Sequence, residues 1–200
     1  MTSNFNPGRE IHRFKTKTGK DAIIRYPQWS DLHAFTEYIN TLSKENTYIT
    51  VFKQEITYED EVKYLSKCFK KIELKEAVQL VCLVEDELVA ISGLNRANYH
   101  RERDNHVAEF AISVRNEYRD SGIGFMLSRS VIEEGLSNIP GIKIICLNVY
   151  AGNDRAIHLY EKLGFEESGR IPGGILYRGN YIDDIKMYLN ADKFKTTSID

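Results

Sequence analysis

Hydrophobic and polar positions follow two spacings along the chain, and the spacing changes from strand-like to helical several times. Two apolar runs joined by the polar turn Glu85-Asp86-Glu87 are typical of an antiparallel pair. A second hairpin is expected near the end of the chain, with Gly179-Asn180 as its tight turn. The pattern predicts strands over residues 11–15, 21–27, 78–84, 88–94, 107–114, 142–149 and 181–189.

Apolar residues spaced by three and four predict helices between these strands. The first is expected to begin near Ser30, and the pair Thr57 and Asp60 has capping spacing for the second, whose apolar stripe reaches Ile72. The first, third and fourth helices are expected over residues 29–42, 122–136 and 154–163. The second is expected from residue 57 to the end of its apolar stripe at residue 72.

The order strand, helix, strand and helix after residue 107 determines the predicted fold class. The strands at Val107 and Ile142 should lie parallel, because a crossover helix is what connects neighbouring parallel strands. The fold is therefore α/β with a mixed sheet. We expect one domain over residues 10–190, between loosely held segments 1–9 and 191–200, because 200 residues suit a single core.

Composition narrows the classes of partner. The 27 Lys and Arg nearly balance the 29 Asp and Glu, so the net charge of −2 favours neither nucleic acid nor an anionic membrane. The sequence has no signal-peptide pattern and no run long enough to span a bilayer, which predicts a cytoplasmic protein. The three cysteines, Cys68, Cys82 and Cys146, lie apart within apolar stretches and predict neither disulfides nor a metal.

The sequence Arg119-Asp120-Ser121-Gly122-Ile123-Gly124 lies between a predicted strand and a predicted helix. Unpaired N–H groups and the positive end of the helix dipole meet there, which favours a phosphate site, although an ordinary tight turn explains the glycines equally well. Leu127 stands where a dinucleotide fingerprint needs a third small residue, and the Gly-Lys-Ser/Thr of a P-loop is absent from this turn.

This turn resembles the pyrophosphate loop of the GCN5-related N-acetyltransferase (GNAT) family, Arg/Gln-x-x-Gly-x-Gly/Ala. Residues 153–165, from Asn153 to Phe165, are similar to the family's second signature, Asn-x-x-Ala-x-x-Leu-Tyr-x-Lys-x-Gly-Phe. The resemblance implies the acyl-CoA N-acyltransferase fold, in which a central parallel strand pair splays apart, and it implies acetyl-CoA as the cosubstrate.

The family's cofactor contacts carry over onto matching positions. The pantetheine arm would pair with the backbone of Ile112, Ser113 and Val114. The diphosphate would contact Arg119, Asp120, Ser121, Gly122, Ile123 and Gly124. Asn153 is either a cofactor contact or the N-cap of the next helix, and both roles can coexist. By the same resemblance, Tyr160 would also contact the cofactor.

Direct transfer to an amine in a ternary complex needs a base and an acid, since an alkylammonium has a pKa of about 10.4. Glu109 is the candidate base because a carboxylate is unusual in an apolar strand, and a buried ion pair is the alternative. His106 or a water chain could serve instead. Tyr160 is the family's thiolate acid by position, or a core aromatic. A covalent route through Cys146 is not expected.

The sequence leaves the acceptor open. Residues 106–114 and 179–184 are most similar to the branch that acts on small amines or amino-acid-like molecules. The alternatives are a protein N-terminal or lysine acetyltransferase, and a module that binds acetyl-CoA without catalysis. The acidic and aromatic groups near the expected acceptor cleft are more typical of a solvated surface: Glu45, Tyr48, Glu55, Asp183 and Asp184. The resemblance also allows a homodimer.

Overall fold

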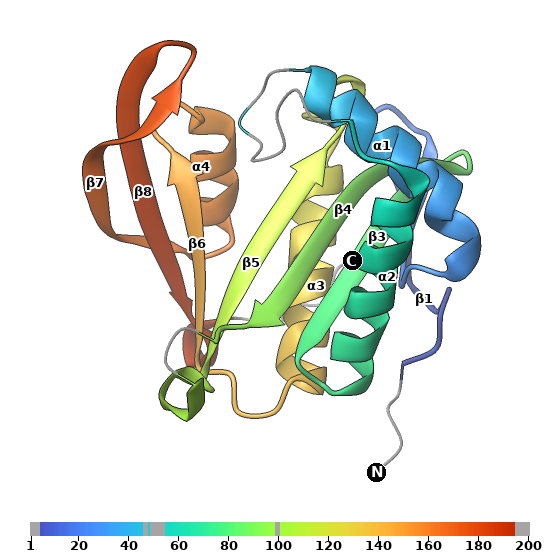
Figure 1. Ribbon diagram of the computed structural model, residues 1–200, viewed down its shortest axis with the longest axis horizontal. Helices are drawn as coiled ribbons and strands as arrows, with labels where there is room; N and C mark the ends of the chain where they lie inside the picture. The colour runs from blue at the N-terminus through green and yellow to red at the C-terminus, as the bar shows by residue number, and fades with distance from the viewer. Residues whose placement is uncertain (1–4, 46–47, 49–54, 99–100, 195–200) are drawn as a thin grey trace. The chain divides into compact units, whose positions relative to one another are not determined.

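The computed structural model describes residues 5–45, 48, 55–98 and 101–194 (Figure 1). Parts of the expected terminal segments, 1–4 and 195–200, lie outside the described residues, as do 46–47 and 49–54 of the connection between the first two helices. The chain divides into two compact units. The first unit comprises residues 1–94 and 111–140, and the second comprises 95–110 and 141–200.

The first unit holds four strands in the order β1-β2-β3-β4, together with the end of β5. The strands are β1 (Glu10–Lys15), β2 (Asp21–Arg25), β3 (Ala77–Val84), β4 (Glu87–Arg96) and β5 (Val107–Val114). The helices are α1 (Leu32–Lys44), α2 (Tyr58–Glu73) and α3 (Ile123–Asn138), with short 3-10 turns at Trp29–Asp31 and Asn116–Tyr118. Strand β3 contacts both α2 and α3, and this position explains why nearly all its residues are buried (Figure 1).

The second unit holds the start of β5 and three further strands in the order β5-β6-β8-β7. Its elements are β6 (Ile144–Tyr150), α4 (Asp154–Lys162), β7 (Glu166–Tyr177) and β8 (Asn180–Asn190), with 3-10 turns at Arg101–Asp104 and Ala191–Lys193. Strands β5 and β6 pair in parallel at Val107↔Ile144, Ala108↔Ile145 and Glu109↔Cys146, which confirms the predicted parallel pair. Strand β8 pairs antiparallel with β6 and with β7.

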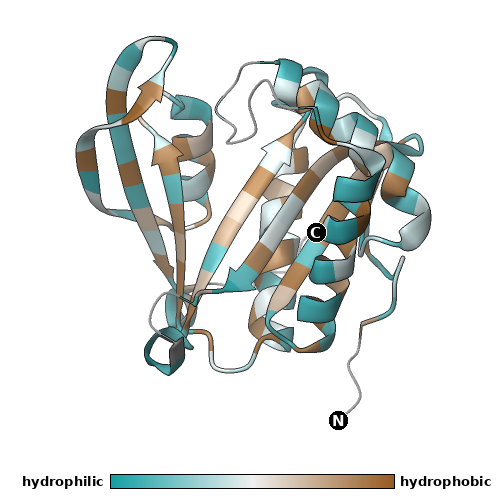
Figure 2. Cartoon of the chain, in the orientation of Figure 1, coloured by the Kyte–Doolittle hydropathy of each residue, from teal (hydrophilic) through white to brown (hydrophobic). Residues whose placement is uncertain are grey.

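Burial alternates along β6 and β8, which gives the second unit one buried face, and along β8 the alternation of polar and apolar residues is visible as alternating colours in Figure 2. The buried face carries Ile145, Leu147 and Val149 from β6, and Ile185, Met187 and Leu189 from β8. Tyr160 of α4 and Phe165 are also buried. In the described part of the chain, no helix combines the length and the apolar character needed to cross a bilayer.

The predicted elements exist, and several boundaries differ from expectation. The first helix begins as a 3-10 turn and extends to Lys44. Strand β2 ends at Arg25, before Pro27, which has no N–H to donate. The final turn lies one residue earlier than expected, because Arg178 and Gly179 adopt positive φ angles of 50° and 82° and Asn180 already belongs to β8. Paired positive φ angles match the right-handed twist of a hairpin.

Candidate active site

The glycine turn forms the start of α3 in the first unit. Gly122 occupies the N-cap position with φ of 91°, in the left-handed region that glycine adopts most easily, and it has no side chain to cap the helix. Asp120 also has a positive φ, of 62°. No N-cap side chain therefore accepts a hydrogen bond from the first-turn N–H groups of this sixteen-residue helix. These N–H groups can bind an anionic ligand instead.

Arg119 does not present a free guanidinium, contrary to the simplest expectation. Its Nη2 donates to Glu45 at 2.6 Å, and its Nη1 donates to Asn116 at 2.9 Å. Its Nε donates to the Val114 carbonyl at 3.0 Å. Arg119 thus ties the end of β5 and the end of α1 to the turn. The described geometry is that of a residue which holds the turn in shape.

Lys17 is a residue that the sequence reasoning missed. Its N–H donates to the Ser121 carbonyl at 2.9 Å, which docks the β1–β2 turn against the glycine turn. A Cβ built on Gly122 would lie 3.8 Å from Lys17 Cγ, so the side chain runs beside the start of α3. Lys17 is exposed and makes no ion pair with a described residue. A basic residue in the turn at residues 17–20 was visible in the sequence, but its proximity to Gly122 was not.

The end of β5 is tied to its surroundings by side chains. The hydroxyls of Ser113 and Tyr38 are hydrogen bonded at 2.8 Å, and Ser92 donates to the Ala111 carbonyl at 2.9 Å. Burial raises the pKa of the Tyr38 hydroxyl, so it remains neutral. Ile112, Ser113 and Val114 are partly buried, and the Val114 carbonyl already accepts the Arg119 bond described above.

Glu109 is exposed on β5, whereas its neighbours Ala108 and Phe110 are buried. It makes no ion pair with a described residue, so the buried ion pair considered from the sequence is not present there. Glu109 lies in register with Cys146, which is partly exposed. Burial and the Glu109 carboxylate both raise the pKa of the Cys146 thiol, which disfavours a thiolate nucleophile. His106 precedes the strand, and its carbonyl accepts bonds from Lys143 and Ile144.

Tyr160 of α4 is 7% exposed and packs in an aromatic cluster in the second unit. Its ring meets Phe110 edge-on, with centroids 6.1 Å apart, and lies 5.9 Å from Phe165. Burial raises the pKa of the Tyr160 hydroxyl to about 12. These ring contacts fix the position of the side chain. The hydroxyl makes no hydrogen bond to a described residue, so it can donate one to a ligand.

Asn153 caps α4, because its side chain accepts from the Ala156 N–H at 3.4 Å. The N-cap interpretation is therefore present in the structure, and the bond uses only the oxygen of the amide. The nitrogen of the same amide can still donate to another group.

The candidate acceptor residues differ in their surroundings. Glu45 is engaged with Arg119, and Asp183 accepts from the Gly173 N–H at 3.0 Å. One oxygen of Asp184 accepts from Asn148 at 3.4 Å, and the other is buried without a partner among the described residues. Glu55 and Tyr48 are exposed. No group of three or more His, Cys, Asp or Glu in the described part is arranged to hold a metal ion.

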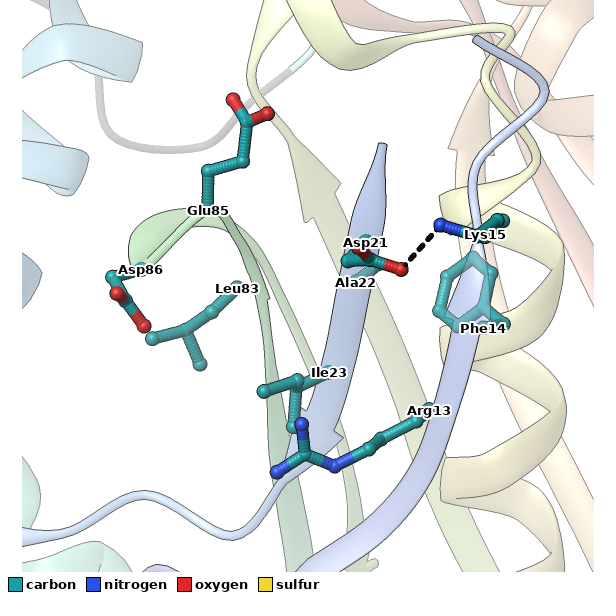
Figure 3. A pocket seen from close by; sticks show the side chains of 9 residues that line it. All are labelled: Arg13, Phe14, Lys15, Asp21, Ala22, Ile23, Leu83, Glu85 and Asp86. Atoms are coloured by element: carbon teal, nitrogen blue, oxygen red, sulfur yellow. Dashed lines mark hydrogen bonds and ion pairs between the residues drawn. The ribbon is translucent and has the colours of Figure 1, made fainter. Parts of the chain in front are cut away.

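A hollow of about 410 Å³ lies elsewhere in the first unit, beside β1, β2 and the β3–β4 turn (Figure 3). Lys15 and Asp21, two of the residues that line it, form an ion pair at 2.7 Å. None of the candidate site residues lines this hollow, so its size does not make it the active site.

Residues 37–165 match the model of the acetyltransferase (GNAT) family, a stretch that contains both the glycine turn and the Asn153 to Phe165 motif. The chain belongs to this family. The GNAT fold predicted from the two motifs is thereby confirmed.

Two curated relatives and one solved structure illustrate the similarity. The L-amino acid N-acetyltransferase AaaT of Escherichia coli strain K12 is 33% identical over 52% of this chain and 63% of its own length. The spermidine N(1)-acetyltransferase of Vibrio cholerae is 31% identical over 58% of this chain and 66% of its own. The chain thus spans less than two thirds of either relative. The structure of yncA from Salmonella typhimurium with its cofactor acetyl-CoA has a TM-score of 0.74 at 17% identity, covering 90% of this chain and 99% of that one, and shows similarity of fold.

Proposed function

We propose that residues 10–190 form an N-acetyltransferase domain that transfers the acetyl group of acetyl-CoA to the primary amine of a small molecule. The observation that carries this proposal is the start of α3, where a left-handed Gly122 leaves a long helix without a side-chain cap, in a chain of the GNAT family. The two relatives, an L-amino acid N-acetyltransferase and a spermidine N(1)-acetyltransferase, support a small amine.

The residues around Gly122 fit a diphosphate. Backbone N–H groups at a helix N-terminus bind anions because they point at the ligand and the helix dipole adds positive potential. Lys17 adds an exposed positive charge beside Gly122. Arg119 acts as a positioning residue through its bonds to Glu45, Asn116 and Val114. Ile112 to Val114 and Asn153 are proposed to contact the pantetheine arm.

Glu109 is the proposed base. The acceptor ammonium must lose a proton before its nitrogen attacks the thioester carbonyl, and an exposed carboxylate without an ion pair can accept it directly or through water. The new C–N bond then forms as the C–S bond breaks, and the nitrogen loses its second proton to water as it becomes an amide. The proton taken by Glu109 passes to solvent.

Tyr160 is the proposed acid. Acetyl-CoA supplies the acetyl group and a leaving thiolate whose conjugate acid has a pKa of roughly 8.5. The Tyr160 hydroxyl, with a pKa raised to about 12, is fully protonated at neutral pH and can donate a hydrogen bond or its proton to that sulfur. The tyrosine regains its proton from solvent, which closes the cycle.

The proposal is tested by following free thiol when the protein is mixed with acetyl-CoA and separate pools of amino acids, polyamines and peptides with free amino ends. Acceleration by a small-amine pool is expected. Acceleration by peptides alone would favour a protein acetyltransferase. Calorimetric binding of acetyl-CoA without turnover in any pool would favour a non-catalytic module, and absence of binding would remove the proposal.

Glu109→Gln tests the base in the same assay. We expect kcat to fall by roughly 10² to 10³, and to recover partly as the pH rises because more of the amine is already deprotonated. Glu161→Gln, an exposed carboxylate change on α4, is the matched control and should keep full activity. Full activity of Glu109→Gln at neutral pH would assign the base to His106 or a water chain.

A further inference from the structure

Helix α1 contacts the stretch of chain that links the end of β5 to the start of α3 (Figure 1). Within the helix, the buried Tyr38 shares a hydrogen bond of 2.8 Å with the hydroxyl of Ser113. Directly after the helix, Glu45 reaches the turn that follows the strand. Residues 113–119 are therefore held by α1 at two points.

Both carboxylate oxygens of Glu45 take part in this contact. One accepts from Arg119 Nη2 at 2.6 Å, and the other accepts from the Asn116 N–H at 3.4 Å. The Arg119 and Glu45 side chains are 19% and 15% exposed, so salt and water screen their ion pair less than they screen a surface pair. Removal of one partner would leave the other charge partly buried without its counter-charge.

Arg119 connects Glu45 to the end of β5. Its Nε donates to the Val114 carbonyl at 3.0 Å and its Nη1 donates to Asn116 at 2.9 Å, so the side chain folds back over the 3-10 turn. Val114 is the last residue of the strand segment proposed to meet the pantetheine arm. Gly122 follows Arg119 in the turn proposed to hold the diphosphate. The Arg119 side chain therefore helps to set the distance between these two parts of the cofactor site.

The glycine turn has a second anchor of its own. The Lys17 N–H donates to the Ser121 carbonyl at 2.9 Å, and this bond does not involve Glu45. The two parts of the proposed acetyl-CoA site thus have separate supports. The β1–β2 turn supports the diphosphate turn, and α1 supports the strand end through Glu45.

We infer that Glu45 is a positioning residue for acetyl-CoA, which acts through Arg119 to hold the pantetheine-binding end of β5 at a fixed distance from the diphosphate-binding turn. This inference rests on the proposed acetyl transfer and assigns to the cofactor site a residue whose place in the sequence suggested the acceptor cleft. A ligand held at two points gains affinity from both only when their spacing matches its own length. Glu45 has no direct contact with the diphosphate in this role, because two negative charges repel each other.

The first test measures the affinity of acetyl-CoA and of adenosine 3′-phosphate 5′-diphosphate, a fragment that has the diphosphate and lacks the pantetheine arm. Glu45→Met should weaken acetyl-CoA binding by roughly 5-fold to 30-fold, because a loosened spacing removes part of the gain from two-point binding. Affinity for the fragment should stay within about 3-fold of wild type, since the glycine turn keeps its own anchor. In steady state, KM for acetyl-CoA should rise, whereas kcat and the KM of the amine should stay near wild type.

The second test asks whether the effect passes through Arg119. The double variant Glu45→Met with Arg119→Met should lose no more acetyl-CoA affinity than Arg119→Met alone, because Glu45 then has no guanidinium to hold. Glu45→Gln keeps one acceptor oxygen and should lie between wild type and Glu45→Met. Glu37→Met is the matched control on α1, because its side chain is 66% exposed and lies 3.9 Å from Arg115, and it should behave as wild type.

Equal losses for acetyl-CoA and for the fragment would overturn the inference, because the effect of Glu45 would then lie on the glycine turn or on the whole fold. Additive losses in the double variant would overturn it too. A raised KM for the amine with unchanged acetyl-CoA affinity would return Glu45 to the acceptor cleft. In these cases acetyl-CoA binding by wild type leaves the proposed function standing.

A wild type that binds acetyl-CoA but not the fragment would contradict the diphosphate turn and remove the inference. A wild type that does not bind acetyl-CoA at all would remove the proposed function, and this inference with it.

Discussion

The Tyr160 hydroxyl combines a fixed ring with a proton that it keeps far above neutral pH. Its pKa is raised to about 12 because burial disfavours the tyrosinate. The protonated form is therefore present at all lower pH values and is lost only as the pH rises through about 12. Any loss of activity between pH 8 and 10 is expected to come from another group.

Tyr160→Phe should lower kcat by roughly 10² to 10⁴ and leave acetyl-CoA affinity within a few-fold of wild type, because the ring and its contacts with Phe110 and Phe165 remain. Steady-state kinetics and calorimetry measure the two quantities. Tyr181→Phe, at a residue that is 77% exposed, is the matched control and should behave as wild type. Wild-type turnover in Tyr160→Phe would show that the residue is a core aromatic alone.

Lys17→Ala should weaken acetyl-CoA binding by roughly 3-fold to 10-fold, a modest effect because the side chain is exposed and screened by salt. The affinity of the variant should also depend less on salt concentration. Lys20→Ala changes a lysine of the same turn whose ammonium pairs with Glu85 at 2.8 Å, and it should leave affinity unchanged. Equal effects of both substitutions would attribute the change to general surface charge.

At the scale of elements, the start of α3 depends on a backbone conformation that glycine alone adopts cheaply. Gly122→Ala has room for its Cβ, since the nearest atom is Lys17 Cγ at 3.8 Å, so its cost is the left-handed φ of 91°. We expect a loss of roughly 1–2 kcal/mol in the free energy of unfolding, together with weaker acetyl-CoA binding.

Gly141→Ala is the matched control for that strain. Gly141 has φ of 78° and open space around it, in the turn that precedes β6. Thermal unfolding should show a similar loss of stability for both variants, whereas calorimetry should show weaker acetyl-CoA binding for Gly122→Ala alone. Unchanged affinity in Gly122→Ala would argue against a phosphate site at this helix start.

At the scale of the whole molecule, a ligand that binds the folded chain stabilises it by mass action. Acetyl-CoA at 100 times its Kd should add about 2.7 kcal/mol to the free energy of unfolding. For a chain of this length that unfolds cooperatively, this raises Tm by roughly 5–10 °C. Differential scanning fluorimetry measures the shift, which should be smaller for Lys17→Ala at the same concentration. A Tm unaffected by millimolar acetyl-CoA would contradict the proposed cofactor.

The sequence by itself determined the order of the elements, the parallel β5–β6 pair and the family. These follow from local information: Thr57 and Asp60 cap α2 as their spacing predicts, a nearly continuous apolar run marks β5, and Asn153 caps α4 where its motif begins. It also identified Glu109 and Tyr160 as candidate catalytic residues. Glu109 was singled out as a carboxylate within an apolar strand, with a buried ion pair as the alternative, whereas the structure shows that its side chain is exposed.

Tertiary structure decided which of these residues meet and which charges remain unpaired. Arg119 is held by Glu45, which lies 74 residues away in the chain, and Lys17 lies beside Gly122 although more than a hundred residues separate them. Strand register, not spacing, puts Glu109, Cys146 and Lys186 on one face. Local periodicity sets the side to which a residue points within its own element, and only the packing of elements sets its neighbours.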